Sequence, residues 1–174
     1  MALIPAVAAA QIWEYYRDAA SIDSDGNPVQ WPPTGDFPSN WAAAYDNYAS
    51  AGVVPGAINQ GGDKSILENF FRGLVSRDNV NEFATALASY WATVAIIPGD
   101  PAHGGTSVAS VTNDAASKVS FFEAAILASI TSNRSEPFFQ NFISNIQSIA
   151  VSQITWYVTE NTLDGPITFP ESIV

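Results

Sequence analysis

The sequence predicts an all-α fold with five or six helices around a single hydrophobic core. Apolar residues recur at intervals of three and four along most of the chain. Residue pairs typical of helix N-termini precede several of these stretches. Prolines and glycines gather between the stretches. The length, 174 residues, is that of one domain. We therefore expect one helical domain over 1–160 and an extended C-terminal arm over 161–174.

The first two helices are separated by a proline-rich loop. Pro5 suits the first turn of a helix, because the N–H that it lacks has no partner there. The apolar residues after it predict a helix to about Ala20. Prolines are dense in 21–38 and predict turns and extended backbone. Ser39 is a suitable N-cap for a second helix that ends at Gly52.

The middle helices are indicated by capping boxes, in which a serine or asparagine is followed three residues later by a glutamate. The pattern occurs at Ser65–Glu68 and at Asn79–Glu82, and each occurrence predicts the start of a helix. The prolines and glycines of 98–105 then interrupt the chain. A fifth helix is expected to begin near Asn113.

The last helix is the longest in this prediction. Ser135 is its expected N-cap, and two adjacent apolar rows predict that it lies at the centre of the fold. Its second half, 149–158, is rich in β-branched and aromatic residues, so a strand is the alternative there. Helix is the preferred interpretation. Gly165 and two prolines make 161–174 extended, and its apolar residues predict docking onto its own domain or a neighbouring subunit.

Charge argues against nucleic acid and membrane as partners. The chain has 17 acidic and 6 basic residues, a net charge of −11, and its cations are scattered. A basic stripe that could neutralise phosphates is therefore missing. No stretch reaches the roughly 20 apolar residues of a membrane span. The N-terminus makes a poor signal peptide, so we expect a soluble protein of intracellular origin or from a virus particle.

The low density of charge is the most informative feature of the composition. Charged residues make up 13% of the chain, against about 25% in an ordinary soluble domain. Such a composition suits a protein whose sides are covered by neighbouring subunits. A monomer with a weakly charged surface is the alternative.

Catalytic motifs are not recognisable. The chain has no cysteine, which excludes thiol chemistry, disulfides and thiolate metal sites. His103 is the only histidine and lies in a glycine-rich loop, without the G-x-S-x-G pattern of an esterase nucleophile. The acidic residues are dispersed, so no pair of carboxylates stands out. We expect no enzymatic activity and no cofactor.

One segment resembles the start of a calcium-binding loop. Asp23, Asp25 and Asn27 alternate as oxygen ligands do in such loops. When the loop is counted from Ser21, its twelfth position is Pro32, where an EF-hand has a bidentate glutamate. An irregular calcium site is therefore one interpretation, and a turn stabilised by its own Asx side chains is the preferred one.

The sequence predicts a non-enzymatic structural subunit of a larger protein assembly that acts through protein–protein contacts as an oligomer. A virus or phage particle is one such setting. The alternatives are a helical domain that binds an apolar small molecule and an enzyme with a dispersed acid–base site. The expected partner-interface residues lie in the proline-rich loop and in the C-terminal tail: Trp31, Phe37, Phe169, Ile173 and Val174.

Overall fold

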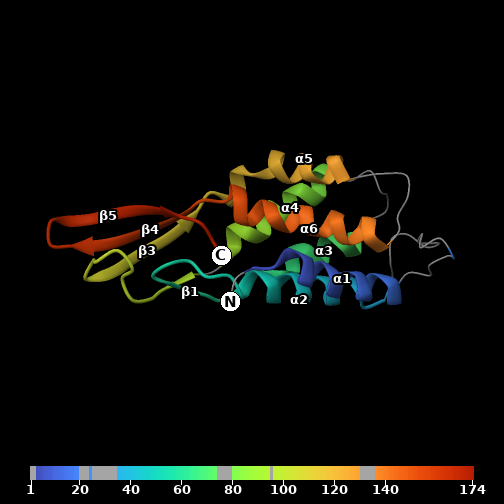
Figure 1. The fold of residues 1–174 in the computed structure, drawn as a ribbon, viewed down its shortest axis with the longest axis horizontal. Helices are drawn as coiled ribbons and strands as arrows, with labels where there is room; N and C mark the ends of the chain where they lie inside the picture. The colour runs from blue at the N-terminus through green and yellow to red at the C-terminus, as the bar shows by residue number, and fades with distance from the viewer. Residues whose placement is uncertain (1–2, 20–23, 25–34, 74–79, 95, 130–135) are drawn as a thin grey trace.

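The computed structural model describes residues 3–19, 24, 35–73, 80–94, 96–129 and 136–174. These residues form six α-helices and five β-strands, so the all-α prediction is wrong and the fold is mixed α/β. The helices make a bundle at one end of an elongated molecule, and the strands project from the other end (Figure 1).

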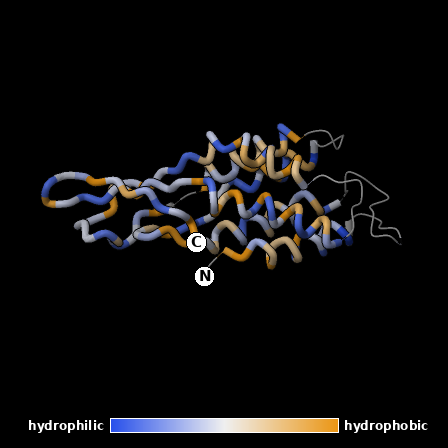
Figure 2. The backbone as a smooth tube through the Cα atoms, turned by 45° about the horizontal axis from the view of Figure 1, so that its top comes forward, coloured by the Kyte–Doolittle hydropathy of each residue, from blue (hydrophilic) through white to orange (hydrophobic). Residues whose placement is uncertain are grey.

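The six helices lie close to where the periodicity predicts them. In Figure 2 hydrophobic positions recur along the helices, as expected for helices that share a core. Two helices begin slightly before the predicted caps: Asp36 takes the N-cap position of the second helix, and Asp63 accepts the N–H of Ser65 at 3.0 Å in the third. The helices are α1 (Pro5–Ala19), α2 (Phe37–Ser50), α3 (Lys64–Gly73), α4 (Val80–Thr93), α5 (Val119–Ser129) and α6 (Glu136–Gln153).

Aromatic side chains fill the core of the bundle. Trp41 stacks on Tyr45 with ring centroids 5.1 Å apart, and the indole N–H of Trp91 donates to the Tyr45 hydroxyl at 3.0 Å. All three side chains are fully buried. Helix α1 packs on α2 and α6, and α4 packs on α3 and α5. The Trp and Tyr rings therefore join α2 to α4, two helices that are distant in sequence.

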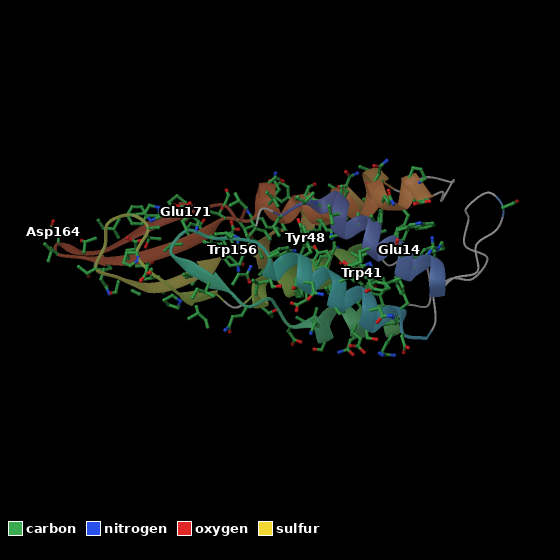
Figure 3. The ribbon with its side chains drawn as sticks, turned by 60° about the horizontal axis from the view of Figure 1, so that its bottom comes forward. Glu14, Trp41, Tyr48, Trp156, Asp164 and Glu171 are labelled. Atoms are coloured by element: carbon green, nitrogen blue, oxygen red, sulfur yellow. The ribbon has the colours of Figure 1, made fainter. Side chains whose placement is uncertain are left out.

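The strands form two small antiparallel sheets. Strand β1 (Ala57–Asn59) pairs with β2 (Ile96–Pro98). The larger sheet has the order β3-β4-β5, with β3 at Ser107–Asn113, β4 at Trp156–Thr162 and β5 at Gly165–Glu171. Its distal end carries Asp164, far from Trp41 in the bundle (Figure 3).

The prediction that a helix begins near Asn113 is wrong, because Asn113 is the last residue of strand β3. Helix α5 begins only at Val119, after a short 3₁₀ turn. The register shifts between Val108 and Ser110, so Val108 faces Glu160 while Val111 faces Val158. This bulge places two inward-facing valines three residues apart, a spacing that resembles a helix rather than a strand.

The helix prediction over 149–158 is also wrong in its second part. Helix α6 ends at Gln153, and β4 begins at Trp156. Trp156 and Val158 are buried while Tyr157 between them is exposed, which is the alternation of a strand with one covered face.

The expected arm over 161–174 contains the end of β4, the hairpin turn and β5. Leu163 and Asp164 separate the paired residues Thr162 and Gly165. Pro166 and Pro170 lie in β5, which is an edge strand of the sheet, where proline is tolerated. After β5 the chain returns to the bundle.

The C-terminal residues are fastened to the end of α2. Val53 and Val174 exchange two backbone hydrogen bonds, at 2.7 and 3.0 Å. Ile173 is fully buried, and a Cβ on Gly52 would lie 2.5 Å from its Cδ1 atom, so only glycine leaves room for this side chain. Leu3 and Ile173 both reach Gly52, where the bundle meets the sheets.

Candidate functional site

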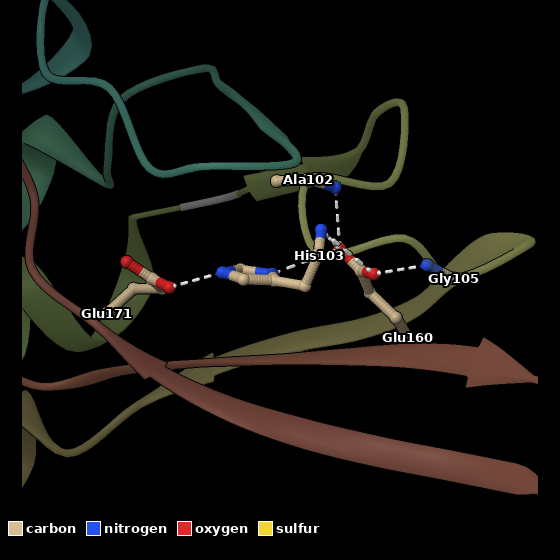
Figure 4. A network of polar contacts seen from close by, with 5 residues as sticks. All are labelled: Ala102, His103, Gly105, Glu160 and Glu171. Atoms are coloured by element: carbon tan, nitrogen blue, oxygen red, sulfur yellow. Dashed lines mark hydrogen bonds and ion pairs between the residues drawn. The ribbon is translucent and has the colours of Figure 1, made fainter.

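A dense polar cluster lies where the loop after β2 crosses the larger sheet (Figure 4). We call Glu160, His103 and Glu171 the polar cluster. The side chain of Glu160 is fully buried. Its carboxylate accepts backbone N–H bonds from Ala102 at 2.6 Å, from His103 at 3.1 Å and from Gly105 at 3.0 Å.

Strand alternation and small loop residues bring this cluster together. Glu160 stands on β4 two residues after Val158, and therefore on the face of the sheet that the loop covers. Gly104 has a φ of +86°, which turns the loop over the carboxylate. A Cβ on Gly105 would lie 2.7 Å from the Cβ of Glu160, so the backbone can approach only without a side chain.

The surrounding donors keep Glu160 ionised. Burial alone would raise its pKa, but the N–H groups of Ala102, Gly105 and His103, together with the His103 ring, outweigh burial and lower the pKa. The negative charge is therefore neutralised by hydrogen bonds inside the fold rather than by solvent.

His103 connects two carboxylates. Its Nδ1 atom lies 3.2 Å from Glu160, and its Nε2 atom lies 2.7 Å from Glu171. Both ring nitrogens can donate together only in the imidazolium form. The ring also stacks on Phe169, with centroids 4.1 Å apart. The cluster thus ties the loop to two strands of the sheet.

Most of the hydrogen-bonding capacity of the polar cluster is used within the fold. The oxygens of Glu160 are occupied by the loop backbone, and His103 is held between two acids rather than beside a nucleophile. Across the described ranges, no group of three His, Asp or Glu side chains is arranged to hold a metal ion. These contacts hold the loop after β2 against the larger sheet.

A second polar group fastens the turn before α3. Asp46 on α2 accepts hydrogen bonds from the Tyr90 hydroxyl at 2.7 Å and from the Gly62 N–H at 2.8 Å. Burial, and then the Asp46 carboxylate, raise the pKa of Tyr90, so its hydroxyl stays a neutral donor. The hydrogen bonds of Asp46 therefore stabilise the fold by holding this turn against α2 and α4.

The expected interface residues have different surroundings. Trp31 lies outside the described residues, as do Asp23, Asp25 and Asn27 of the calcium-like segment. Phe37 is 2% exposed and packs edge-on against Tyr16 and Phe71 in the bundle. Phe169 stacks on His103, Ile173 is buried, and Val174 is 54% exposed.

Val174 belongs to an apolar surface at the junction of bundle and sheets. We call Leu3, Ile4, Val7, Val53 and Val174 the junction surface. Its four most exposed members, Ile4, Val7, Val53 and Val174, are 45–66% exposed. Leu3 joins the two parts of this surface, because it reaches Gly52 next to Val53.

The junction surface continues into a shallow groove of about 240 Å³ between α1 and α2. Sequence reasoning missed this feature, because Val7 fits the apolar row of α1 and therefore resembles a core residue. The groove is lined by Leu3, Ile4, Val7, Ala8, Gln11, Ala44, Asn47, Tyr48 and Ala51, none of them charged.

Comparison with known proteins gives no family: no family model, curated protein or solved structure matches the chain. None of the helices in the described part of the chain is long and apolar enough to cross a membrane.

Proposed function

We propose that this protein is a non-enzymatic structural subunit of a larger protein assembly, joined to neighbouring subunits, including copies of itself, through apolar contacts. The junction surface is the observation that carries the proposal. A virus or phage particle is the setting that the composition suggests.

Exposed apolar side chains on a soluble protein usually mark a contact site when they are contiguous. On the junction surface, five apolar side chains from three distant parts of the sequence meet without a charged residue among them. Covering apolar area yields roughly 25 cal/mol per Å². A neighbouring subunit would therefore gain free energy by covering this surface, which itself carries no carboxylate.

The polar groups support a structural role rather than a catalytic one. Glu160 and Asp46 each bind backbone N–H groups that belong to neighbouring loops. Catalytic carboxylates need free lone pairs that face a substrate. The oxygens of these two carboxylates instead accept hydrogen bonds from other parts of the same chain.

The groove between α1 and α2 favours a second candidate, the binding of an apolar small molecule. Its volume of about 240 Å³ is below the roughly 300–1,000 Å³ of typical ligand pockets, and it is shallow. A protein side chain inserted from a neighbour suits such a groove better than a free ligand.

Light scattering coupled to gel filtration tests the proposal. We expect the wild type to exceed its chain mass of 18.5 kDa at high concentration. Val7→Asp should lower the mass of the oligomer, because it places a charge in the apolar contact. Asn40→Asp is the matched control: it adds the same charge at an exposed position at the other end of the bundle and should change nothing.

A wild type that stays monomeric at every concentration would overturn self-assembly. A thermal shift of that monomer on adding apolar ligands, lost in Val7→Asp, would favour the second candidate. Equal loss of mass in Val7→Asp and Asn40→Asp would show that net charge, not the junction surface, controls association.

A further inference from the structure

Helix α5 presents a second apolar face to solvent, on the far side from the helices it packs against. It lies at the outer edge of the bundle, against α4 and α6 (Figure 1). On its outer face Phe121 is 43% exposed and Leu127 is 56% exposed. The other exposed residues of this face are Ser120, Ala124 and Ala128.

The outer face of α3 shows what an ordinary surface helix of this bundle looks like. Helix α3 exposes Lys64, Asn69 and Arg72, and Arg72 forms an ion pair with Glu68 at 2.6 Å. Helix α5 exposes no charged side chain on its outer face. Its one charged residue, Glu123, lies toward α4, where it accepts a hydrogen bond from Asn81 at 3.4 Å. A helix apolar on all sides is normally covered.

The exposed residues of α5 are arranged symmetrically about Ala124. Phe121 precedes Ala124 by three positions, and Leu127 follows it by three. Two antiparallel copies of the helix, related by a two-fold axis at Ala124, would place each Phe121 against the Leu127 of the other copy. A symmetric dimer needs such a self-complementary face, and the small side chain at the centre permits close approach of the helices.

The distribution of charge also favours a second copy as the partner of this face, because the exposed residues of α5 on both copies would be uncharged. At a net charge of −11, two copies repel each other least where a surface carries few carboxylates. Lys118 stands just before α5, with its ammonium 5.7 Å from the Phe121 ring and 2.8 Å from Asp114. In the antiparallel arrangement it lies near the C-terminal end of the partner helix, where the helix dipole favours a cation.

Resting on the proposed function, we propose that a second copy of this chain binds the outer face of α5 in an antiparallel, two-fold arrangement centred on Ala124. This contact is distinct from the junction surface, so the two together extend an assembly beyond a dimer. A helix of eleven residues is about 16 Å long. Its contact area is below that of a standard stable interface, which makes covalent capture the suitable test.

The absence of cysteine from the chain makes this capture unambiguous. In the Ala124→Cys variant the two thiols meet at the axis, and mild oxidation should yield a covalent dimer on a non-reducing gel. Thr85→Cys is the control, because Thr85 is an exposed small residue on the neighbouring helix α4. Circular dichroism checks that both variants keep the wild-type fold.

Orientation is tested by mixing two further variants. Ser120→Cys and Ala128→Cys should each form little dimer alone, because the axis separates like positions. Their mixture should form the mixed dimer, since position 120 of one copy meets position 128 of the other. Strong self-dimerisation of Ser120→Cys would indicate parallel helices and would overturn the antiparallel arrangement.

The outcomes separate this inference from the proposed function. We expect Leu127→Glu to reduce dimer capture through Ala124→Cys at least tenfold, and Val7→Asp to leave it unchanged. If Ala124→Cys is captured no faster than Thr85→Cys, the α5 contact is wrong. In that case the proposed function still stands, provided that the wild type is oligomeric and Val7→Asp is not.

Discussion

The bundle and the larger sheet are held together by different forces. The bundle depends on interlocked aromatic rings such as Trp41 and Trp91, whose packing does not change with pH. The sheet end depends on one ionised carboxylate, Glu160, which binds the loop that covers it. From this difference we expect the sheet end to open in acid before the aromatic core of the bundle does.

The largest expected effect falls on the bundle. Trp91→Ala removes a fully buried ring and its bond to Tyr45, and should lower the free energy of unfolding by about 3–5 kcal/mol. Urea unfolding followed by far-UV circular dichroism measures this change. Trp91→Phe, which keeps most of the ring, should cost much less. Equal costs for the two variants would contradict the packing argument.

Ile173 links the two regions, and its truncation comes next. Ile173→Ala leaves a cavity beside Gly52 and should cost about 2–5 kcal/mol in the same urea experiment. Val174→Ala is the control, because Val174 is 54% exposed and its truncation should cost under about 0.5 kcal/mol. A cost for Ile173→Ala as small as that of the control would mean that the C-terminus is not docked in solution.

The stabilisation that Glu160 provides should be limited to the sheet end of the molecule, and its size should depend on pH. Its folded pKa is lowered, so its contribution to stability is complete above the unfolded pKa of about 4.3 and is lost as the pH falls through the folded pKa. The protection factors of the Ala102, His103 and Gly105 amides, which correct for the slower intrinsic exchange in acid, should therefore fall as the pH is lowered, while amides of the bundle core stay protected.

Glu160→Gln tests this assignment directly. The variant should lose protection of the same three amides at neutral pH and show no further loss as the pH falls. Asp164→Asn, at the exposed hairpin turn, is the control and should keep the wild-type profile. An unchanged acid profile in Glu160→Gln would assign the pH dependence to another group.

The smallest effect should come from Gln147 in the bundle. Its side chain is fully buried, and neither amide atom has a hydrogen-bond partner among the described residues. Gln147→Leu should therefore raise the free energy of unfolding by about 1 kcal/mol, because the unpaired polar group is removed. Gln153→Leu, at a partly exposed position, should change it by less than about 0.5 kcal/mol. Destabilisation by Gln147→Leu would show that the amide is satisfied in solution.

The helices were predictable because local signals determine them. Apolar periodicity and prolines or caps at the ends place α1, α3 and α6 within a few residues. The strands were harder to place: 149–158 offered a strand only as the alternative to a helix, and β5 lies in the segment expected to be an extended arm. The bulge in β3 sets Val108 and Val111 three residues apart, and β4 follows α6 so closely that the apolar pattern continues across the boundary.

The polar cluster could be anticipated only in part. The sequence singles out His103 as the one histidine, in a loop rich in glycine. It gives no sign that Glu160 is buried, because the donors that stabilise the carboxylate come from a loop more than fifty residues earlier. The exposed faces were equally hidden, since Val7 and Leu127 fit apolar patterns whose exposure depends on which helices pack beside them.

The two prolines of β5 have a consequence for behaviour at high concentration. By the alternation of the antiparallel ladder, Pro166, Thr168 and Pro170 direct their backbone away from β4. Of these three positions, only Thr168 has an N–H to offer. A foreign strand therefore finds almost no donors along this edge, and we expect growth into amyloid-like fibrils to be disfavoured there. A protein crowded among its own copies can in this way remain free of strand-to-strand aggregation at the tip that it projects furthest.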